Sequence, residues 1–423
     1  MTTATTRQDH HPMTPPTAET STCRVGRGVL GAVVLVSAIA PLATDMYVPA
    51  FPAVGRDLGA GATAVQLTLT TFFVGMALGQ LLGGPHSDAH GRRRPLVTAL
   101  VVLTLAALAC GLAPSIEAMT AARFVQGLAG GWAMVTARSV LVDLSRGPGL
   151  VRSLNLVAGV GGVAPIVGPL LGGLILQFSQ WRVSFWAVAA LSVAMVVAVL
   201  AAVPESLPPD GRHQGGLADV ARAARVVLRH HRYVAFVVVA ASSMGATFAY
   251  VATSAYILQA MNGLSPLAYS ADFALNAVGL ALATLLAARL AGRVRTERVV
   301  AAGLAASAAA GAALLVGALW LGTPLWLAAA AFFVLMSAQG LVGPNAGALA
   351  SDAVPEHPGT GSAVLGFLQW CVAGLIAPLT GVAGEGTAVP MAVIILVLAA
   401  VSTVALISLS RMGTAPLVQS TTG

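Results

Sequence analysis

Few charged residues lie inside apolar segments of the sequence, and the positions of two of them suggest proton or cation chemistry. Asp45 lies in "APLATDMYVP" between Pro41 and Pro49, which loosen a helix and free backbone carbonyl groups. Arg123 opens "RFVQGLAGG". An ionised side chain within a membrane costs several kcal/mol, so such a residue is a candidate functional group. A carboxyl group in a low-dielectric cavity also binds a proton more readily than one in water, as a reversible proton carrier must.

Each of these residues also has a static interpretation. Asp45 would cap a neighbouring helix or pair permanently with an arginine. Arg123 would extend outward to the membrane surface, because Glu117 lies only six residues before it. In the dynamic interpretation, Arg123 near Asp45 favours the ionised carboxylate, and its movement away favours protonation. The sequence leaves both interpretations open.

A denser group of charges lies in "GGPHSDAHGRRRP", residues 83–95, between two apolar segments. One interpretation is a solvated turn that only sets the topology. That turn explains the arginines but not the spacing of the glycines and the aspartate. The other interpretation is a latch between helices, in which an arginine pairs with Asp143. The latch residues would be Gly84, Asp88, Gly91, Arg92, Arg93 and Asp143.

Membrane-spanning helices must position these groups. Of the 423 residues, 57% are hydrophobic and 9% are charged, and the mean hydropathy is +0.85, whereas a soluble domain has about 25% charged residues. A helix needs about 20 apolar residues to cross the hydrocarbon. Alternating barrel strands are absent, and all eight histidines lie in tails or loops, which excludes a histidine relay. Twelve segments are predicted spans: 29–51, 64–84, 95–113, 117–141, 154–177, 183–203, 233–258, 268–290, 298–320, 324–346, 361–383 and 388–410.

The spans divide into two sets of six. The longest polar stretch, 204–232, separates them, and the basic loop "AGRVRTER" between the eighth and ninth spans is a degenerate counterpart of the loop between the second and third. Such a repeat predicts an all-α integral membrane protein with two six-helix bundles around a central cavity. The predicted parts are a disordered tail (1–28), a first bundle (29–203), a linker (204–232), a second bundle (233–411) and a second tail (412–423).

The basic residues predict the orientation. All 22 are arginine, and 19 of them fall on one side if the N-terminus is cytoplasmic, against two, Arg56 and Arg182, on the other. Positive residues collect on the cytoplasmic side of membranes, so both termini are expected there. Topology therefore explains the net charge of +7 and leaves nucleic-acid binding without support.

The chain resembles the major facilitator superfamily over almost its whole length. "GPHSDAHGRRR" is similar to the signature after the second span, although His86 stands where an apolar residue is usual and Ala89 where a basic one is usual. "RFVQGLAGG" and "GVGGVAPIVGPLLGG" resemble motifs of the drug:proton antiporters with twelve spans. "ATDMYVPAFPAV", "GLVGPNAGALA" and "GTGSAVLGFLQ" resemble the Bcr/CflA branch of bicyclomycin and chloramphenicol exporters, from which Ala255 departs, since proline is usual there.

This resemblance implies roles for several residues. Asp88 is expected at the N-terminus of the eleventh span, where a helix dipole favours a carboxylate, so that the latch holds the cytoplasmic side closed. Arg123 resembles an arginine that influences proton affinity. The fifth span is expected to form a hinge, as opposed to generic close packing, with Gly161, Pro165, Gly168, Pro169, Gly172 and Gly173.

Polar and aromatic side chains within the spans are candidates for the lining of a substrate cavity. Buried amides need hydrogen-bond partners, which water or substrate would supply. A structural hydrogen bond between helices is an equally good interpretation for each one. The candidates are Tyr47, Gln126, Tyr250, Tyr256, Asn276, Asn345, Gln369 and Trp370.

The predicted function is proton-coupled export of a hydrophobic antibiotic, phenicol-like or bicyclomycin-like, by alternating access. The alternative is transport of a native metabolite, with drug resistance incidental. No phosphate-binding loop, metal-ligand cluster or nucleophile–base pair is evident, so neither ATP-driven pumping, an enzyme, a metal nor a cofactor is expected. The expected partners are protons, one small-molecule drug and the lipid of a bacterial plasma membrane, and the resemblance implies a monomer.

Overall fold

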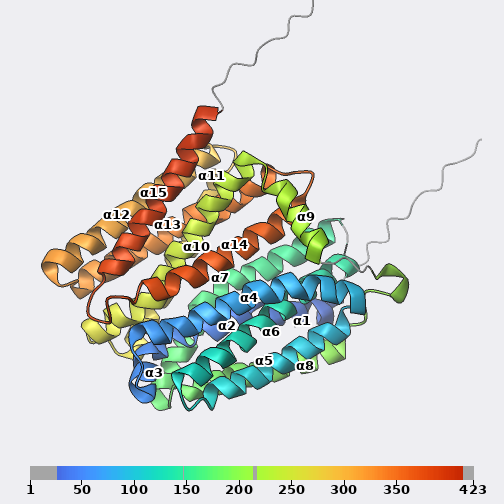
Figure 1. Cartoon of the computed structure of the whole chain (residues 1–423), viewed down its shortest axis with the longest axis horizontal. Coiled ribbons are helices and arrows are strands. Elements are labelled where there is room, and N and C mark those ends of the chain that lie inside the picture. The colour runs from blue at the N-terminus through green and yellow to red at the C-terminus, as the bar shows by residue number, and fades with distance from the viewer. Residues whose placement is uncertain (1–25, 146, 213–216, 413–423) are drawn as a thin grey trace, which may run out of the picture.

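The computed structural model describes residues 26–145, 147–212 and 217–412 of the chain. The two predicted tails therefore lie almost wholly outside the described residues. Within these ranges every regular element is a helix and none is a strand, which agrees with the all-α prediction (Figure 1).

The helices follow the order expected from the sequence. The first half contains α1 (Arg27–Ser37), α2 (Ile39–Asp45), η1 (Val48–Ala50), α3 (Phe51–Leu58), α4 (Ala62–His90), α5 (Arg93–Gly111), α6 (Ile116–Leu144), α7 (Gly147–Phe178) and α8 (Arg182–Ala202). The connecting segment contains η2 (Pro209–Gly211) and α9 (Leu217–Val227). The second half contains α10 (His231–Ala255), η3 (Tyr256–Met261), α11 (Pro266–Leu290), α12 (Thr296–Val316), η4 (Gly317–Leu321), α13 (Leu325–Asp352), α14 (Pro358–Leu379) and α15 (Val389–Met412).

Every predicted span coincides with helical structure. Ten helical segments among the described residues are long and apolar enough to cross a membrane, and 162–178 in α7 is a shorter apolar segment. The first predicted span is broken into α1, α2, η1 and α3, with Pro41, Pro49 and Pro52 among its residues. Proline removes a backbone donor and crowds the preceding turn, so the breaks follow from the sequence.

The predicted second span is too short. Instead of ending at residue 84, α4 continues through Pro85 to His90, so His86 and His90 lie on a helix and not in a loop. Gly91 ends the helix with φ of +89°, a value that glycine adopts readily. A Cβ atom on Gly91 would lie 2.6 Å from the Glu205 carboxylate, whereas one on Gly84 would meet only Val135 at 4.0 Å. Gly91 is therefore required by its surroundings.

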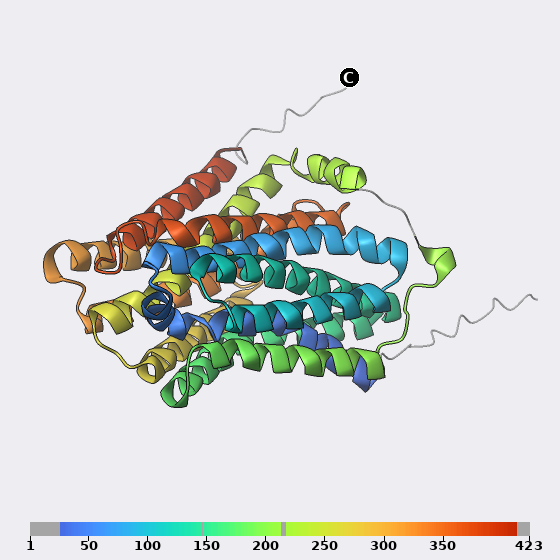
Figure 2. The ribbon, with the colours of Figure 1, turned by 60° about the horizontal axis from the view of Figure 1, so that its bottom comes forward.

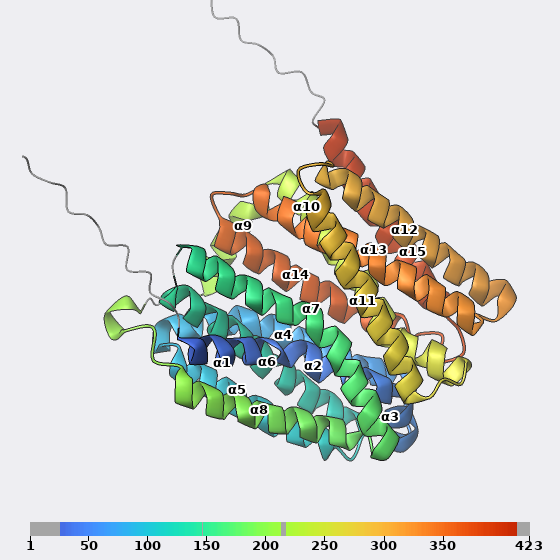
Figure 3. The same cartoon turned by 180° about the vertical axis from the view of Figure 1, so that it is seen from behind.

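The helices form two groups, α1–α8 and α10–α15, which Figures 1 and 3 show side by side. The groups meet where α4 packs on α14 and where α7 packs on α11. We call one end of the molecule the linker end, because the α4–α5 turn contacts the connecting segment there (Figure 2). The opposite end, where the start of α8 bonds to α3, is the far end.

Glycines allow α4 and α6 to form the most extensive helix contact of the molecule. A Cβ atom on Gly75 or Gly79 of α4 would overlap the backbone of Leu128 on α6, and one on Gly127 or Gly131 would overlap the backbone of α4. Close approach of small residues is a main source of helix association in membranes, where apolar burial gives little driving force. The first half is consequently a tightly packed unit.

This packing predicts the effect of adding one methyl group. Gly79→Ala must separate α4 from α6, and we expect it to destabilise the protein by about 1–3 kcal/mol. The matched control is Gly31→Ala on α1, where a Cβ atom meets nothing within 4 Å. The thermal midpoint of the detergent-purified protein measures both. Equal midpoints for the two variants would contradict the close packing.

Candidate functional site

Arg123 is buried inside the first half, with 0% of its surface exposed. Its Nη1 atom donates to the Ala43 carbonyl at 3.1 Å and to Gln126 Oε1 at 2.7 Å. Its guanidinium carbon lies 4.2, 5.1 and 5.7 Å from the ring centres of Phe72, Tyr47 and Phe185, respectively. Cation–π attraction of this kind offsets part of the desolvation cost. The outward-extended interpretation of Arg123 is therefore wrong in this structure.

Asp45 is the last residue of α2 and is only 6% exposed. No hydrogen bond or ion pair of its carboxylate occurs among the described residues. Arg123 binds the backbone of α2 at Ala43, so the anticipated Asp45–Arg123 ion pair is not formed here. The carboxyl end of a helix carries partial negative charge, which disfavours a second negative charge there. Asp45 is therefore a buried carboxyl group without a described partner, at a helix end that disfavours negative charge.

A second carboxylate, Asp272 on α11, lies near this region and was not singled out from the sequence. Asn276 connects it to Tyr250, because its Nδ2 atom donates to Asp272 Oδ2 at 2.9 Å and to the Tyr250 hydroxyl at 3.0 Å. The hydroxyl groups of Ser254 and Tyr269 are 2.9 Å apart. The position of Asp272 within the predicted span 268–290 was the signal that could have identified it.

Asp45 and Asp272 lie on elements that meet near the contact between the halves. The η1 turn, which follows Asp45 in the first span, contacts both α10 and α11. Phe273 and Phe332 pack against Tyr250 with ring centres 5.2 Å away. The broken first span thus meets α10 and α11 in a region with two carboxyl groups, hydroxyl groups and ring faces. Such a region can hold protons or an organic cation.

The other predicted cavity residues do not all join this region. Gln126 and Tyr47 belong to the core around Arg123, since Gln126 binds the guanidinium and the Tyr47 hydroxyl lies 3.0 Å from Thr68 Oγ1. Both side chains therefore bond within the first half, Gln126 to an arginine of its own helix and Tyr47 to α4. Tyr256 is also buried, and its ring packs 6.0 Å from that of Phe51 across the two halves.

The residues predicted near the C-terminal helices occupy other places. Trp370 on α14 lies between the halves, with its ring centre 5.4 Å from that of Phe73 on α4. Asn345 donates to the Leu341 carbonyl of its own helix at 2.8 Å. Gln369 is half-buried beside Trp370 in sequence. Trp370 is therefore the member of this set that contacts the opposite half through a described ring contact.

The glycines of α7 fit against two partners. A Cβ atom on Gly168 would lie 2.9 Å from Asp45 Cβ, and one on Gly172 would overlap the Met46 carbonyl of the first span. A Cβ atom on Gly173 would overlap Ser270 of α11 in the second half. The surroundings of Gly161 are outside the described part. Two prolines of the predicted hinge, Pro165 and Pro169, lie within the helix.

Arg92 is the centre of a charged network at the linker end. It is 7% exposed, and its Nε atom donates to Asp143 Oδ2 at 2.9 Å, while Nη1 donates to Asp88 and, at 2.7 Å, to Ser87. Its backbone N–H donates to Glu205 at 2.7 Å. Burial lowers the pKa of Arg92, but the two carboxylates outweigh this effect, so the pKa lies above its ordinary value. Of the two arginines that could pair with Asp143, Arg92 and Arg93, it is Arg92 that forms the pair.

Two other latch residues differ from expectation. Asp88 binds Arg92 in its own half, and none of its described hydrogen bonds reaches α14, where the eleventh predicted span begins. Arg93 donates to the Leu200 carbonyl at 2.7 Å and so links α5 to α8. Neither residue bonds to the second half, because the described hydrogen bonds between the two halves lie toward the far end. These are Thr63 to Gly381 at 2.7 Å, Gln66 to Ala252 at 2.9 Å and Gln259 to Pro49 at 3.1 Å.

Comparison with known proteins agrees with this architecture. A model of the Major Facilitator Superfamily matches residues 33–378. The chain is 30% identical to the uncharacterised MFS-type transporter YdgK of Bacillus subtilis, over 89% of the chain and 94% of the relative. It is 28% identical to a bicyclomycin resistance protein homolog of Haemophilus influenzae, over 84% and 89%. The multidrug resistance protein MdtL of Escherichia coli is 27% identical over 56% of the chain and 60% of MdtL.

Solved structures share the fold at low identity. A bacterial homolog of the lysosomal transporter Spinster, in an inward-facing and unoccupied conformation, has a TM-score of 0.73 at 15% identity, over 90% of this chain and 97% of that one. The xylose transporter XylE of Escherichia coli, in a partially occluded inward-open conformation, has a TM-score of 0.67 at 14% identity, over 94% and 99%.

The network at Arg92 predicts a measurable coupling. Arg92→Gln leaves Asp143 without its cation, and we expect a loss of about 2 kcal/mol in stability, the scale of a hydrogen bond to a charged group. Asp143→Asn in the same background should add much less than it does alone. Thermal midpoints of the two single variants and the double variant measure this coupling. Additive effects would mean that the pair contributes nothing to stability.

Proposed function

The chain belongs to the major facilitator superfamily and is a membrane transporter, not an enzyme, and on this premise we propose that it is a proton-coupled antiporter. Its cargo would be a hydrophobic antibiotic or a similar small molecule, exported from a bacterial cell. The observation that carries the proposal is the buried, unpaired carboxyl group of Asp45 in the broken first span, beside the contact between the halves.

Proton coupling requires a carboxyl group whose environment changes between two conformations. Asp45 faces Gly168 of α7, and Gly173 on the same helix contacts α11 of the opposite half. A displacement of α11 against α7 therefore reaches the surroundings of Asp45 through one helix. Protonation of Asp45 would favour the buried position of its side chain seen here, and release of the proton would favour an arrangement in which the carboxylate contacts water.

The same region provides for a substrate. Tyr250 and Phe332 offer ring faces, and Asp272 offers negative charge next to them. Competition between proton and drug for this acidic, aromatic region gives exchange of one for the other. The relatives named for bicyclomycin and multidrug resistance support a drug as cargo.

We assign the linker end to the cytoplasm, because most of the arginines lie there. Hydrogen bonds such as Thr63–Gly381 and Gln259–Pro49 then join the halves on the outer side. The conformation would be inward-facing, and export would require these contacts to break while the linker end closes.

Asp88 would serve closure of the linker end. Its side chain is 45% exposed, although Arg92 holds one of its oxygens. The N-terminus of α14 has no side-chain cap in this conformation. Free N–H groups at a helix start attract a carboxylate, so Asp88 would accept hydrogen bonds from α14 when the halves approach there.

Asp45→Asn tests the coupling. Asparagine keeps the shape of the side chain but carries no exchangeable carboxyl proton, so export driven by a pH gradient in proteoliposomes should fall at least tenfold. Drug exchange at equal drug concentrations, which needs no net proton movement, should continue. Proton movement followed with a pH-sensitive dye measures the coupling directly.

Asp352→Asn is the matched control for that experiment, because Asp352 is exposed at the end of α13. It should leave both assays unchanged. Undiminished gradient-driven export by Asp45→Asn would remove Asp45 as the proton carrier. Export that survives collapse of the proton gradient in the unmodified protein would refute proton coupling itself.

Asp272→Asn tests the substrate region separately. Removal of this charge should weaken transport of lipophilic cations at least fivefold, whereas neutral phenicols should be much less affected, because only the cations gain from the carboxylate. Transport assays with ethidium and chloramphenicol in parallel measure the ratio. An equal loss for both drugs would indicate a structural role for Asp272 through Asn276 and Tyr250.

A further inference from the structure

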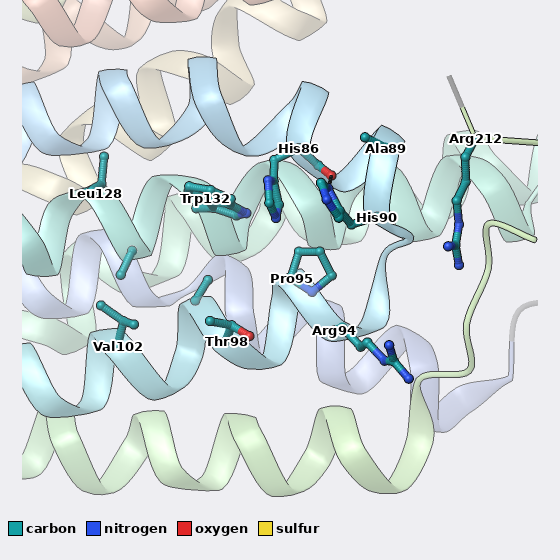
Figure 4. Close-up of a pocket in the computed structure, with 12 residues that line it drawn as sticks. His86, Ala89, His90, Arg94, Pro95, Thr98, Val102, Leu128, Trp132 and Arg212 are labelled. Atoms are coloured by element: carbon teal, nitrogen blue, oxygen red, sulfur yellow. Dashed lines mark hydrogen bonds between the residues drawn. The ribbon is translucent and has the colours of Figure 1, made fainter. Parts of the chain in front are cut away.

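A pocket of about 490 Å³ lies outside the region of Asp45, on the first half near the linker end. Helices α4 and α5 both pack on α6 but contact each other little, so α6 forms the floor of a groove between them. Leu128, Ala129 and Trp132 of α6 line this floor. Figure 4 shows the labelled side chains of α4, α5 and α6 around one common space.

The lining of the pocket changes from apolar to basic along its length. Val102, Leu128 and Trp132 line one part, while Arg94 and Arg212 lie toward the linker end (Figure 4). No acidic residue is among the described lining residues. Arg212 and Glu205 both approach Gly91, and neither Arg94 nor Arg212 takes part in an ion pair described for the chain.

Two histidines form the wall between these parts. The rings of His86 and His90 stack with centres 4.1 Å apart, and the ring of His86 packs edge-on against Trp132 at 5.0 Å. His90 lies one helical turn after His86 and contacts its backbone carbonyl at 3.1 Å. Imidazole N–H groups facing a cavity are donors for an anionic oxygen.

Two departures from the family signature lie at this pocket. His86 stands where an apolar residue is usual, and Ala89, which also lines the pocket, stands where a basic one is usual. A long side chain at position 89 would occupy space that the methyl group of alanine leaves free.

The pocket opens beside a surface that must face lipid. Arg94, Thr98, Val101 and Leu105 follow one another at helical spacing on α5. Val101 and Leu105 are 42% and 61% exposed. In a membrane these apolar side chains contact acyl chains, and Arg94 at the head of the same stripe lies at headgroup level.

We propose that this pocket binds one phospholipid with an anionic headgroup, taken from the leaflet at the linker end. The phosphate would lie between Arg94, Arg212 and the histidine pair. One acyl chain would follow the groove over Trp132 and Val102. Basic groups between helices at the membrane surface, together with an adjoining apolar groove, match the two parts of such a lipid. This assignment does not depend on the transported substrate.

Native mass spectrometry of the full-length protein in detergent tests the proposal with phosphatidylglycerol and phosphatidylcholine as probes. The unmodified protein should retain one phosphatidylglycerol in preference to phosphatidylcholine. Arg94→Gln combined with Arg212→Gln should weaken phosphatidylglycerol binding about 25-fold, since each basic residue near the surface adds roughly a factor of five. Thr98→Trp, at an exposed lining position, should weaken binding of both lipids by filling the groove.

The matched control removes two arginines from the equivalent turn of the second half. Arg293, between α11 and α12, and Arg298, in the first turn of α12, are exposed and lie outside the pocket, so Arg293→Gln with Arg298→Gln should leave lipid binding unchanged. An equal loss in this control would show that net charge, and not the pocket, attracts the lipid. Inorganic phosphate is the third probe in this binding experiment. Displacement of the lipid by millimolar phosphate would mean that the site takes a free anion and would overturn the assignment to a lipid.

Discussion

The cost of charge in a low-dielectric interior determines which residues of this protein occupy its middle. Most ionisable groups lie at the helix ends, where Arg92 forms ion pairs with two carboxylates. Within the spans, Arg123 is made tolerable by ring faces and a backbone carbonyl, whereas Asp45 has no described partner. The two residues meet the cost of burying a charge in different ways. The arginine keeps its charge and gains partners, whereas the carboxyl group can lose its charge by binding a proton. Only the carboxyl group responds in this way to its surroundings.

Close packing turns this local property into a property of whole helices. The glycines of α4 and α6 bring their backbones together, so the first half resists deformation, and Gly173 applies the same device between α7 and α11 of opposite halves. Interfaces of this kind have few intermediate arrangements, because a small displacement already costs overlap or lost contact. Movement of the halves as units follows more readily from such packing than movement of single helices.

The sequence predicted the spans well because length and hydropathy alone define a crossing helix. It placed Asp143 at the same end as Arg92 and Arg93 but left open which of the two arginines would pair with it. It failed where three-dimensional neighbours decide. The helix through Pro85 continues to His90, and the rings around Arg123 come from other spans whose proximity the sequence does not show. Asp272 was visible in the sequence, but its pairing with Asn276 and Tyr250 depends on α10 and α11 packing side by side, which no local pattern encodes.

The energy that separates two conformations of such a molecule is small, as the contacts at the far end illustrate. Three described hydrogen bonds, those of Thr63, Gln66 and Gln259, join the halves there, and each is worth about 0.5–1.5 kcal/mol net. One elementary charge crossing 100 mV of membrane potential carries about 2.3 kcal/mol. These quantities are of the same order, so under the proposed function a change in the charge of one carboxyl group would be enough to shift the balance between the halves. Asp45 would be the group on which such a change acts, because it lies beside α7, and α7 contacts α11 of the opposite half.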